Sequence, residues 1–285
     1  MPALPSSVIE PVWDQFAALI PEHIDTHPLG CHNPRIPDRV VFDKLVQVLV
    51  LGAAYDKIAD HTCSATTIRN RRDEWIAAGI FEALEQACLD AYDRIVGLDL
   101  ADVTADGCLA KAPCGGQAAG RSPVDRGKLG TKRSLLTDGN GIPVGCVIAP
   151  GNRHDSPFLR PTLETLGRFE TRLGIGFGIG LPDEITVHLD AGYDSATTRD
   201  LLDELGCQAV ISQKGHPLQA GRRWVVERTH AWHTRGFKKL AICTERRTRV
   251  IAAFIALANA VIITRQLLRA AWTTHRWDTR PARQP

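Results

Sequence analysis

Apolar residues recur with helical spacing through most of the first 97 positions. Short polar turns and glycines interrupt this spacing, which predicts helices over residues 12–20, from a cap at Asp38 or Asp43 through Gly52, and over 65–78 and 80–96. The third helix follows a tight turn at His61–Ser64 and carries three arginines. This outline is typical of a helix-turn-helix in which Ile68 and Trp75 face the core and Arg71 points outward. A plain helical hairpin with a solvated basic face is the alternative.

After Gly97 the pattern changes to short apolar runs separated by helices. We expect a strand from Leu98 that ends at Asp106, and an irregular glycine-rich loop over 107–130. The turn DGNG at 138–141 then joins two strands of a hairpin. Further along, the pattern predicts helices and strands in alternation, over the ranges 156–173 (helix), 184–189 (strand), 195–205 (helix), 208–211 (strand), 222–240 (helix) and 247–271 (helix).

Strand, hairpin, helix, strand, helix, strand, helix is the order of a ribonuclease-H-like (RNase-H-like) domain. The expected fold class is therefore α/β, with a mixed sheet flanked by helices over residues 98–271. A small all-helical, helix-turn-helix-like domain precedes it over residues 1–97, and a basic tail follows over 272–285. A chain of 285 residues with 44% hydrophobic content is long enough for two such cores.

The net charge of +2 hides an uneven distribution. Residues 222–285 carry 14 Lys and Arg against 3 Asp and Glu, a formal charge of +11, whereas residues 1–221 carry −9. A basic segment beside an acidic body suits a polyanion held next to a metal-binding centre, and this favours contact with nucleic acid over a merely solvated surface.

Neither a membrane span nor a secretory signal is predicted. The apolar run at 254–263 is shorter than the roughly 18 residues that a span requires, and it is better interpreted as a buried helix. The eight cysteines include no CxxC motif and no Cys/His set with zinc-ligand spacing, which favours reduced thiols. We therefore expect a cytoplasmic, nucleoid-associated protein.

Three acids stand out as candidates for metal chemistry. Asp106 and Asp190 each end a predicted strand, and Glu227 is the only acid in the basic segment RRWVVERTHAWHTRGFKKL. Carboxylates are the ligands that Mg²⁺ prefers. Two such ions would activate a water or 3′-hydroxyl and stabilise the leaving oxygen of a phosphodiester, with Asp106 bridging both ions.

Each acid also has a structural explanation. Asp106 and Asp190 are suited to accept hydrogen bonds in turns after strands, and Glu227 to form a surface ion pair with Arg223. His188 is expected to serve packing and His230 to be structural. Asp155 is either a supporting group beside the metal ligands or the cap of the following helix.

Several motifs in a fixed order then point to a family. DG at 106, KRSLLTDGNGIPVG, GNRHDS, LDAGYDS and WVVERT together resemble the DDE transposases of bacterial insertion sequences, in particular the insertion-sequence-five group. The resemblance covers about residues 40–265. It implies an RNase-H-like catalytic domain and Mg²⁺-dependent cutting and joining of DNA at the terminal inverted repeats of the element.

The resemblance also implies specific residues and partners. The catalytic and metal-binding triad would be Asp106, Asp190 and Glu227, with two Mg²⁺ ions for which Mn²⁺ can substitute. The partners would be double-stranded DNA and further copies of the chain, in a homodimer or higher multimer. As DNA-binding residues we expect Arg69, Arg71, Arg72, Arg223, Arg235, Lys238 and Lys239.

One motif departs from the family pattern. Related transposases carry a Tyr, Arg, Glu, Lys series around the third acid, whereas this chain has Ala220 and Thr234 at the Tyr and Lys positions. Arg235 is then the candidate for the missing basic role. Two alternatives stay open: a metal-dependent nuclease of the same fold that does not rejoin DNA, and an inactive derivative that only binds it.

Overall fold

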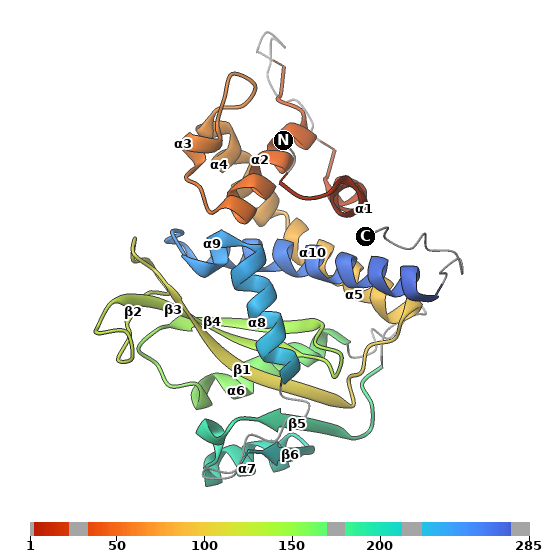
Figure 1. The fold of residues 1–285 in the computed structure, drawn as a ribbon, viewed down its shortest axis with the longest axis vertical. Coiled ribbons are helices and arrows are strands. Elements are labelled where there is room, and N and C mark those ends of the chain that lie inside the picture. The colour runs from red at the N-terminus through yellow and green to blue at the C-terminus, as the bar shows by residue number, and fades with distance from the viewer. Residues whose placement is uncertain (1–2, 23–33, 170–179, 213–223, 275–285) are drawn as a thin grey trace, which may run out of the picture.

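A computed structural model describes residues 3–22, 34–169, 180–212 and 224–274 of the chain. Its helical N-terminal part lies above a mixed sheet, and the long last helix runs between the two (Figure 1). The five N-terminal helices are α1 (Ser6–Leu19), α2 (Asp38–Leu51), α3 (Tyr55–Ile58), α4 (Ala65–Ala77) and α5 (Ile80–Ile95). The predicted helices are confirmed, and α1 begins earlier than expected because Val8 and Ile9 also pack into the core.

Aromatic side chains form the centre of the helical part. Phe16 lies with its ring centroid 4.8 Å from that of Phe42, 4.9 Å from Trp75 and 5.6 Å from Phe81. Such tilted and edge-on pairs add to the stability that burial alone gives. Four separate helices are thereby joined by one cluster.

Within the described residues the sheet has six strands, in the order β2-β3-β1-β5-β6, and β4 lies off this path and also pairs with β3. Strands β1, β3 and β4 are antiparallel neighbours, whereas β5 and β6 run parallel to β1. This is the mixed arrangement of an RNase-H-like domain, and it confirms the expected fold class. The strands are β1 (Asp102–Lys111), β2 (Gly120–Arg121), β3 (Leu129–Thr137), β4 (Pro143–Pro150), β5 (Ile185–Leu189) and β6 (Cys207–Ile211).

The predicted end of the first strand is wrong. Strand β1 continues through Asp106 to Lys111, and a short strand β2 lies inside the region expected to be an irregular loop. Strand β1 extends to Lys111 because it pairs with β3 along this length, with Asp106 opposite Leu135 and Lys111 opposite Gly130. Glycines weaken the strand signal in the sequence, but backbone hydrogen bonds to β3 do not depend on side chains.

Helices cover the sheet and connect its strands. They are α6 (Ser156–Leu163), which continues as a 3-10 helix (Glu164–Phe169), then α7 (Ala196–Glu204), α8 (Trp224–Gly236), α9 (Lys238–Ala241) and α10 (Thr248–Thr274). Ser195 caps α7 as expected, because its hydroxyl accepts a hydrogen bond from the amide of Thr198. The last part of the predicted helix 156–173 lies outside the described residues.

Helix α10 packs against α1 and α5 and also against β4, so the helical part and the sheet share one hydrophobic core. By length and composition, the stretch Thr248–Thr273 is long and apolar enough to cross a membrane, contrary to the estimate from the sequence. However, 78% of its most apolar window is buried inside the protein, as expected of a core helix. Residues 254–263 are thus a buried helix, as predicted.

Candidate active site

Asp106 and Asp190 lie at the same level on neighbouring parallel strands. Strands β1 and β5 are in register at Thr104 and His188, and each aspartate follows two residues later. Because side chains alternate along a strand, a step of two residues returns to the same face of the sheet. By this register the two acids lie on the same face of the parallel pair, Asp106 within β1 and Asp190 directly after the end of β5.

Each aspartate is oriented by a backbone amide. An Oδ1 oxygen of Asp106 accepts a hydrogen bond from the amide of Gly107 at 2.8 Å. The Oδ1 oxygen of Asp190 accepts one from the amide of Gly192, also at 2.8 Å. These bonds fix one oxygen of each carboxylate, and the bond of Asp190, to the amide two residues on, is an Asx turn.

Helix α8 brings Glu227 to the same edge. The helix packs on β1 and β3, and His230 Nε2 lies 3.7 Å from Asp106 Oδ2. Residues three apart share a helix face, so Glu227 stands one turn from this contact, in an exposed position. Among the described residues, however, no three His, Cys, Asp or Glu side chains are grouped closely enough to hold a metal ion. The three acids share one region of the surface without forming a closed ligand set.

A fourth acid, Asp155, lies next to Gly107, the residue that follows Asp106 in β1. A Cβ added to Gly107 would lie 2.0 Å from Asp155 Oδ1, so this carboxylate occupies the space beside residue 107. Asp155 does not cap α6 through its side chain; instead Lys132 Nζ lies 3.0 Å from its Oδ1. Of the two roles expected for Asp155, the one beside the candidate metal ligands fits the geometry.

The buried side chain of Tyr193 lies within electrostatic range of Asp106, Asp155 and Asp190, which we call the acidic cluster. Burial raises the pKa of this phenol well above its usual range, and the negative charges of Asp155, Asp106 and Asp190 raise it further. Three carboxylates therefore act on one buried hydroxyl. Tyr193 and Lys132 had no signal in the sequence beyond their places in LDAGYDS and KRSLLT.

His230 and His233 are buried and neutral. Burial lowers the pKa of His230 to about 4, helped by the nearby charge of Arg133. Burial lowers that of His233 to about 3. His233 Nε2 lies 2.7 Å from Asn259 Oδ1, and Asn259 Nδ2 donates to Glu85 Oε1 at 2.6 Å. This chain of polar contacts ties α8 to α10 and α5.

Two other candidates have structural roles. His188 Nε2 lies 2.7 Å from Asp102 Oδ1 on the neighbouring strand, so it serves packing as predicted. Asp138 is the acceptor of the hairpin turn, where its side chain binds the amides of Asp99, Asn140 and Ile142. Burial raises the pKa of Asp138 to about 6. Neither residue belongs to the acidic cluster.

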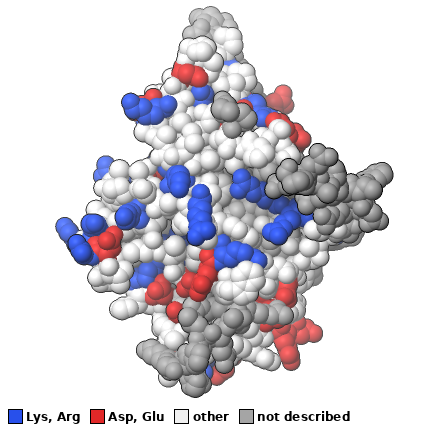
Figure 2. Space-filling view, in the orientation of Figure 1, with Lys and Arg blue, Asp and Glu red and all other residues white. Residues whose placement is uncertain are grey.

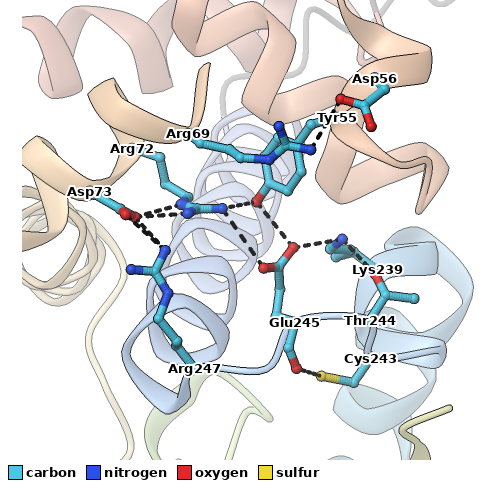
Figure 3. Close-up of polar contacts among 10 residues, drawn as sticks. All are labelled: Tyr55, Asp56, Arg69, Arg72, Asp73, Lys239, Cys243, Thr244, Glu245 and Arg247. Carbon is cyan, nitrogen blue, oxygen red and sulfur yellow. Dashed lines mark hydrogen bonds and ion pairs between the residues drawn. The ribbon is translucent and has the colours of Figure 1, made fainter. Parts of the chain in front are cut away.

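The expectation that Arg71 points outward is wrong. Its side chain is buried, where it forms ion pairs with Asp38 and with Glu74, the latter at 3.3 Å between Nε and Oε2. Arg72 is buried as well and contacts Tyr55, Asp73 and Glu245 (Figure 3). Asp38, Tyr55 and Glu245 among these partners lie far away in the sequence, and together the contacts leave both guanidinium groups turned inward, so neither is a surface for DNA.

Of the remaining basic candidates, some are accessible and one is not. Lys239 is only 3% exposed, and its Nζ lies 2.7 Å from Glu245 Oε1, so its assignment to DNA is also wrong (Figure 3). Arg69 is partly exposed, where it pairs with Asp56 at 3.1 Å. Arg235 and Lys238 are exposed. Arg223 lies outside the described residues.

The residues at this edge are suited to a divalent metal by their chemistry. Carboxylate oxygens are what Mg²⁺ and Mn²⁺ prefer, and the buried, neutral imidazole of His230 lies beside Asp106. Within the described ranges, neither ring nitrogen of His230 has a hydrogen-bond partner. An unsatisfied buried polar group next to several carboxylates is a place where a further ligand or water would be stabilised.

Comparisons with known proteins agree on one family. A family described as "Putative transposase of IS4/5 family" matches residues 9–85, and two described as "Transposase DDE domain" match residues 102–217 and 187–265. The chain is 35% identical over 154 residues to a protein of Burkholderia cepacia named "Putative transposase for insertion sequence element IS402". That alignment covers 53% of this chain and 71% of the relative.

Two further matches are more limited. The transposase for insertion sequence element IS1106 of Neisseria meningitidis serogroup B is 37% identical over 30% of this chain and 25% of its own length. Among solved structures, the catalytic domain of Mos1 mariner transposase covers 67% of this chain and 92% of its own, with 11% identity and a TM-score of 0.32. Because that structural likeness is weak, the fold assignment rests on the strand order.

Proposed function

The chain belongs to the DDE transposases of the IS4/5 family, and from this premise we propose that Asp106, Asp190 and Glu227 are its catalytic carboxylates. In this proposal the protein binds the terminal inverted repeats of its insertion sequence and catalyses strand cleavage and strand transfer. The observation that carries the proposal is the register of β1 and β5. It aligns two of the three acids on one face, and the contact of His230 with Asp106 brings the helix of the third acid to the same edge.

A DDE transposase requires a divalent metal ion. We propose that the metal here is Mg²⁺, replaceable by Mn²⁺, that two ions bind, and that all three acids hold them. When bound, such ions activate the attacking oxygen and stabilise the leaving one. The exposed position of Glu227 on α8 leaves its side chain room to turn toward the two aspartates.

The surrounding residues set the charge and geometry of the site. Lys132 pairs with Asp155 and so offsets part of the negative charge beside Asp106. Neutral His230 packs α8 against β1 without adding positive charge. The hydrogen bonds from Gly107 and Gly192 hold the aspartates in place before substrate arrives, and such preorganisation is the main contribution that a protein makes to this chemistry.

The proposed partners are double-stranded DNA, at the element ends and at the target, and a second copy of the chain. Both ends of an element must be held together to be joined, which requires at least a dimer. The cell's DNA would be the site of action, so we propose a cytoplasmic, nucleoid-associated protein. Among the basic residues, Arg69, Arg235 and Lys238 are exposed enough to contact DNA.

The test is a strand-transfer assay with purified protein, Mg²⁺ and labelled DNA bearing the inverted repeats that flank the gene. Asp106→Asn, Asp190→Asn and Glu227→Gln should each abolish products while DNA binding is retained. Asp203→Asn, which changes an exposed acid on α7, is the matched control and should retain full activity.

Other outcomes of the assay would favour the alternatives. Cleavage without joined product would indicate a nuclease of the same fold. Binding without any product from the unmodified protein would indicate an inactive derivative. Full activity of any one of the three triad variants would remove that residue from the proposed site.

A further inference from the structure

A groove of about 360 Å³ lies between α8 and α10, outside the acidic cluster. Its lining includes Arg228, Trp232, Arg235, Ile262, Arg265 and Gln266. Positions 228, 232 and 235 follow one another at helical spacing along α8. They form a face next to the one that carries Glu227 and His230. The same helix therefore presents its one acid, Glu227, on one face and arginines on the adjoining face.

The arginines of the groove are only partly compensated, since the charge of Asp138 acts on Arg228 but forms no ion pair with it. Within the described ranges, no ion pair joins Arg228, Arg235 or Arg265 to a carboxylate, whereas Arg69, Arg71 and Arg72 of α4 all have one. Burial lowers the pKa of Arg265 and of Arg228, and the charge of nearby Arg269 lowers that of Arg228 further. Charges that are both partly desolvated and mutually repelling are stabilised by an anion.

Two tryptophans hold the first of these arginines in place. The guanidinium carbon of Arg228 lies 4.3 Å from the ring centroid of Trp224 and 4.7 Å from that of Trp232. Its NH2 group also donates to the carbonyl of Asn140 in the hairpin turn. Such stacking fixes the plane of the guanidinium and lowers the entropy lost when it binds a ligand.

The spacing of the charges indicates a polymer rather than a single anion. Arg228 and Arg235 are seven residues apart, which is about 10 Å along a helix. That length spans about three nucleotide steps of roughly 3.4 Å each. Figure 2 shows that Lys and Arg side chains gather over the helices in the middle of this face, directly beside a group of acidic ones.

We propose that the groove between α8 and α10 binds the phosphodiester backbone of DNA and guides a strand toward Glu227. The proposal builds on the function proposed above and identifies Arg235 and Arg265 as phosphate contacts, with Arg228 held as a fixed charge beside them. The contacts are sequence-independent, as phosphate contacts are.

The experiment measures the affinity of the full chain for a short random-sequence duplex, without divalent metal, across a series of salt concentrations. Arg235→Ala and Arg265→Ala should each reduce the slope of log K against log[salt] by about 0.9, the value for one lost phosphate contact. Arg235→Lys should restore the slope, because an ammonium group also binds phosphate. Arg160→Ala, which removes an exposed arginine of α6, is the control and should leave the slope unchanged.

Two results would overturn the proposal. One is a slope that stays unchanged in both groove variants; the other is binding of polyglutamate that duplex DNA fails to displace, which would identify an acidic protein as the occupant. Because the assay needs no metal, it is independent of cleavage. If the protein binds DNA through these arginines but never cuts it, the proposed function is refuted, whereas the proposal that the groove binds DNA is supported.

Discussion

At the scale of single residues, the acidic cluster depends on the missing side chain at position 107. Asp155 occupies the space where a Cβ would lie, and Lys132 keeps it there. The carboxylate of Asp155, partly neutralised by Lys132, therefore lies beside the residue that follows Asp106. The DG pair at 106 matters for this steric reason, because Gly107 has no backbone angle that only glycine can adopt.

Gly107→Ala should therefore displace Asp155 and disturb Asp106. A misplacement of about 1 Å at a reacting centre costs roughly a hundredfold in rate, so we expect a loss of about that size in metal-dependent cleavage. Gly167→Ala is the control, because a Cβ at Gly167 meets nothing within 4 Å. Equal cleavage rates for the two variants would mean that Asp155 has no part in the site.

At the scale of elements, helix α8 is held by a buried polar chain rather than by apolar packing alone. His233 contacts Asn259 of α10, which contacts Glu85 of α5, and Arg168 pairs with Glu85 at 3.2 Å. Removing one member of such a chain leaves its partner buried and unsatisfied. The position of Glu227 thus depends on residues of the N-terminal helices.

The burial of His233 in this series of contacts makes the free energy of unfolding depend on pH. The pKa of His233 is about 3 in the folded protein, against an ordinary value of 6.5. Below pH 6.5 the unfolded chain takes up a proton that the folded protein does not, so the free energy of unfolding falls as the pH drops. Between pH 6.5 and 5 the loss from this residue is about 2 kcal/mol.

His233→Gln retains a hydrogen-bond donor for Asn259 but cannot titrate, so it should flatten this part of the pH profile in denaturant unfolding. The matched control is His61→Gln, which changes an exposed histidine and should leave the profile as it was. An equally steep profile in His233→Gln would assign the pH dependence to other groups.

At the scale of the whole molecule, the helical part and the sheet are joined by a polar cluster around Glu245, which precedes α10. Glu245 accepts from Tyr55 and pairs with Arg72 and Lys239, while Arg247 pairs with Asp73 (Figure 3). These contacts connect α3 and α4 to the start of α10. Together with the shared core, they predict that both parts unfold together.

Glu245→Gln should lower the free energy of unfolding by roughly 3 kcal/mol, because Lys239 would remain buried without its counter-charge while Arg72 would keep only Asp73. The transition in denaturant should stay single. Glu10→Gln breaks only an exposed pair with Arg39 and should change stability far less. Two separated transitions in the unmodified protein would contradict the shared core.

The sequence predicted most of the elements, and the exceptions have physical reasons. Apolar spacing is a local signal, so helices such as α4 and α7 were found within a residue or two. Strand β2 and the end of β1 depend on pairing with β3, which no local pattern reveals. The burial of Arg72 depends on Glu245, which lies more than 170 positions later. The three acids and Asp155 were proposed from their motifs, whereas the place of Tyr193 beside Asp106, Asp155 and Asp190 follows only from the fold.

The most direct test of the central claim is metal-directed backbone cleavage. Fe²⁺ bound in place of Mg²⁺ generates radicals that cut nearby peptide bonds, and the fragments are identified by mass spectrometry. The account predicts cuts close to Asp106, Asp190 and Glu227, all suppressed by excess Mg²⁺ and all lost in Asp106→Asn. Cuts near only one of these residues, or a pattern unchanged in Asp106→Asn, would contradict a shared metal site.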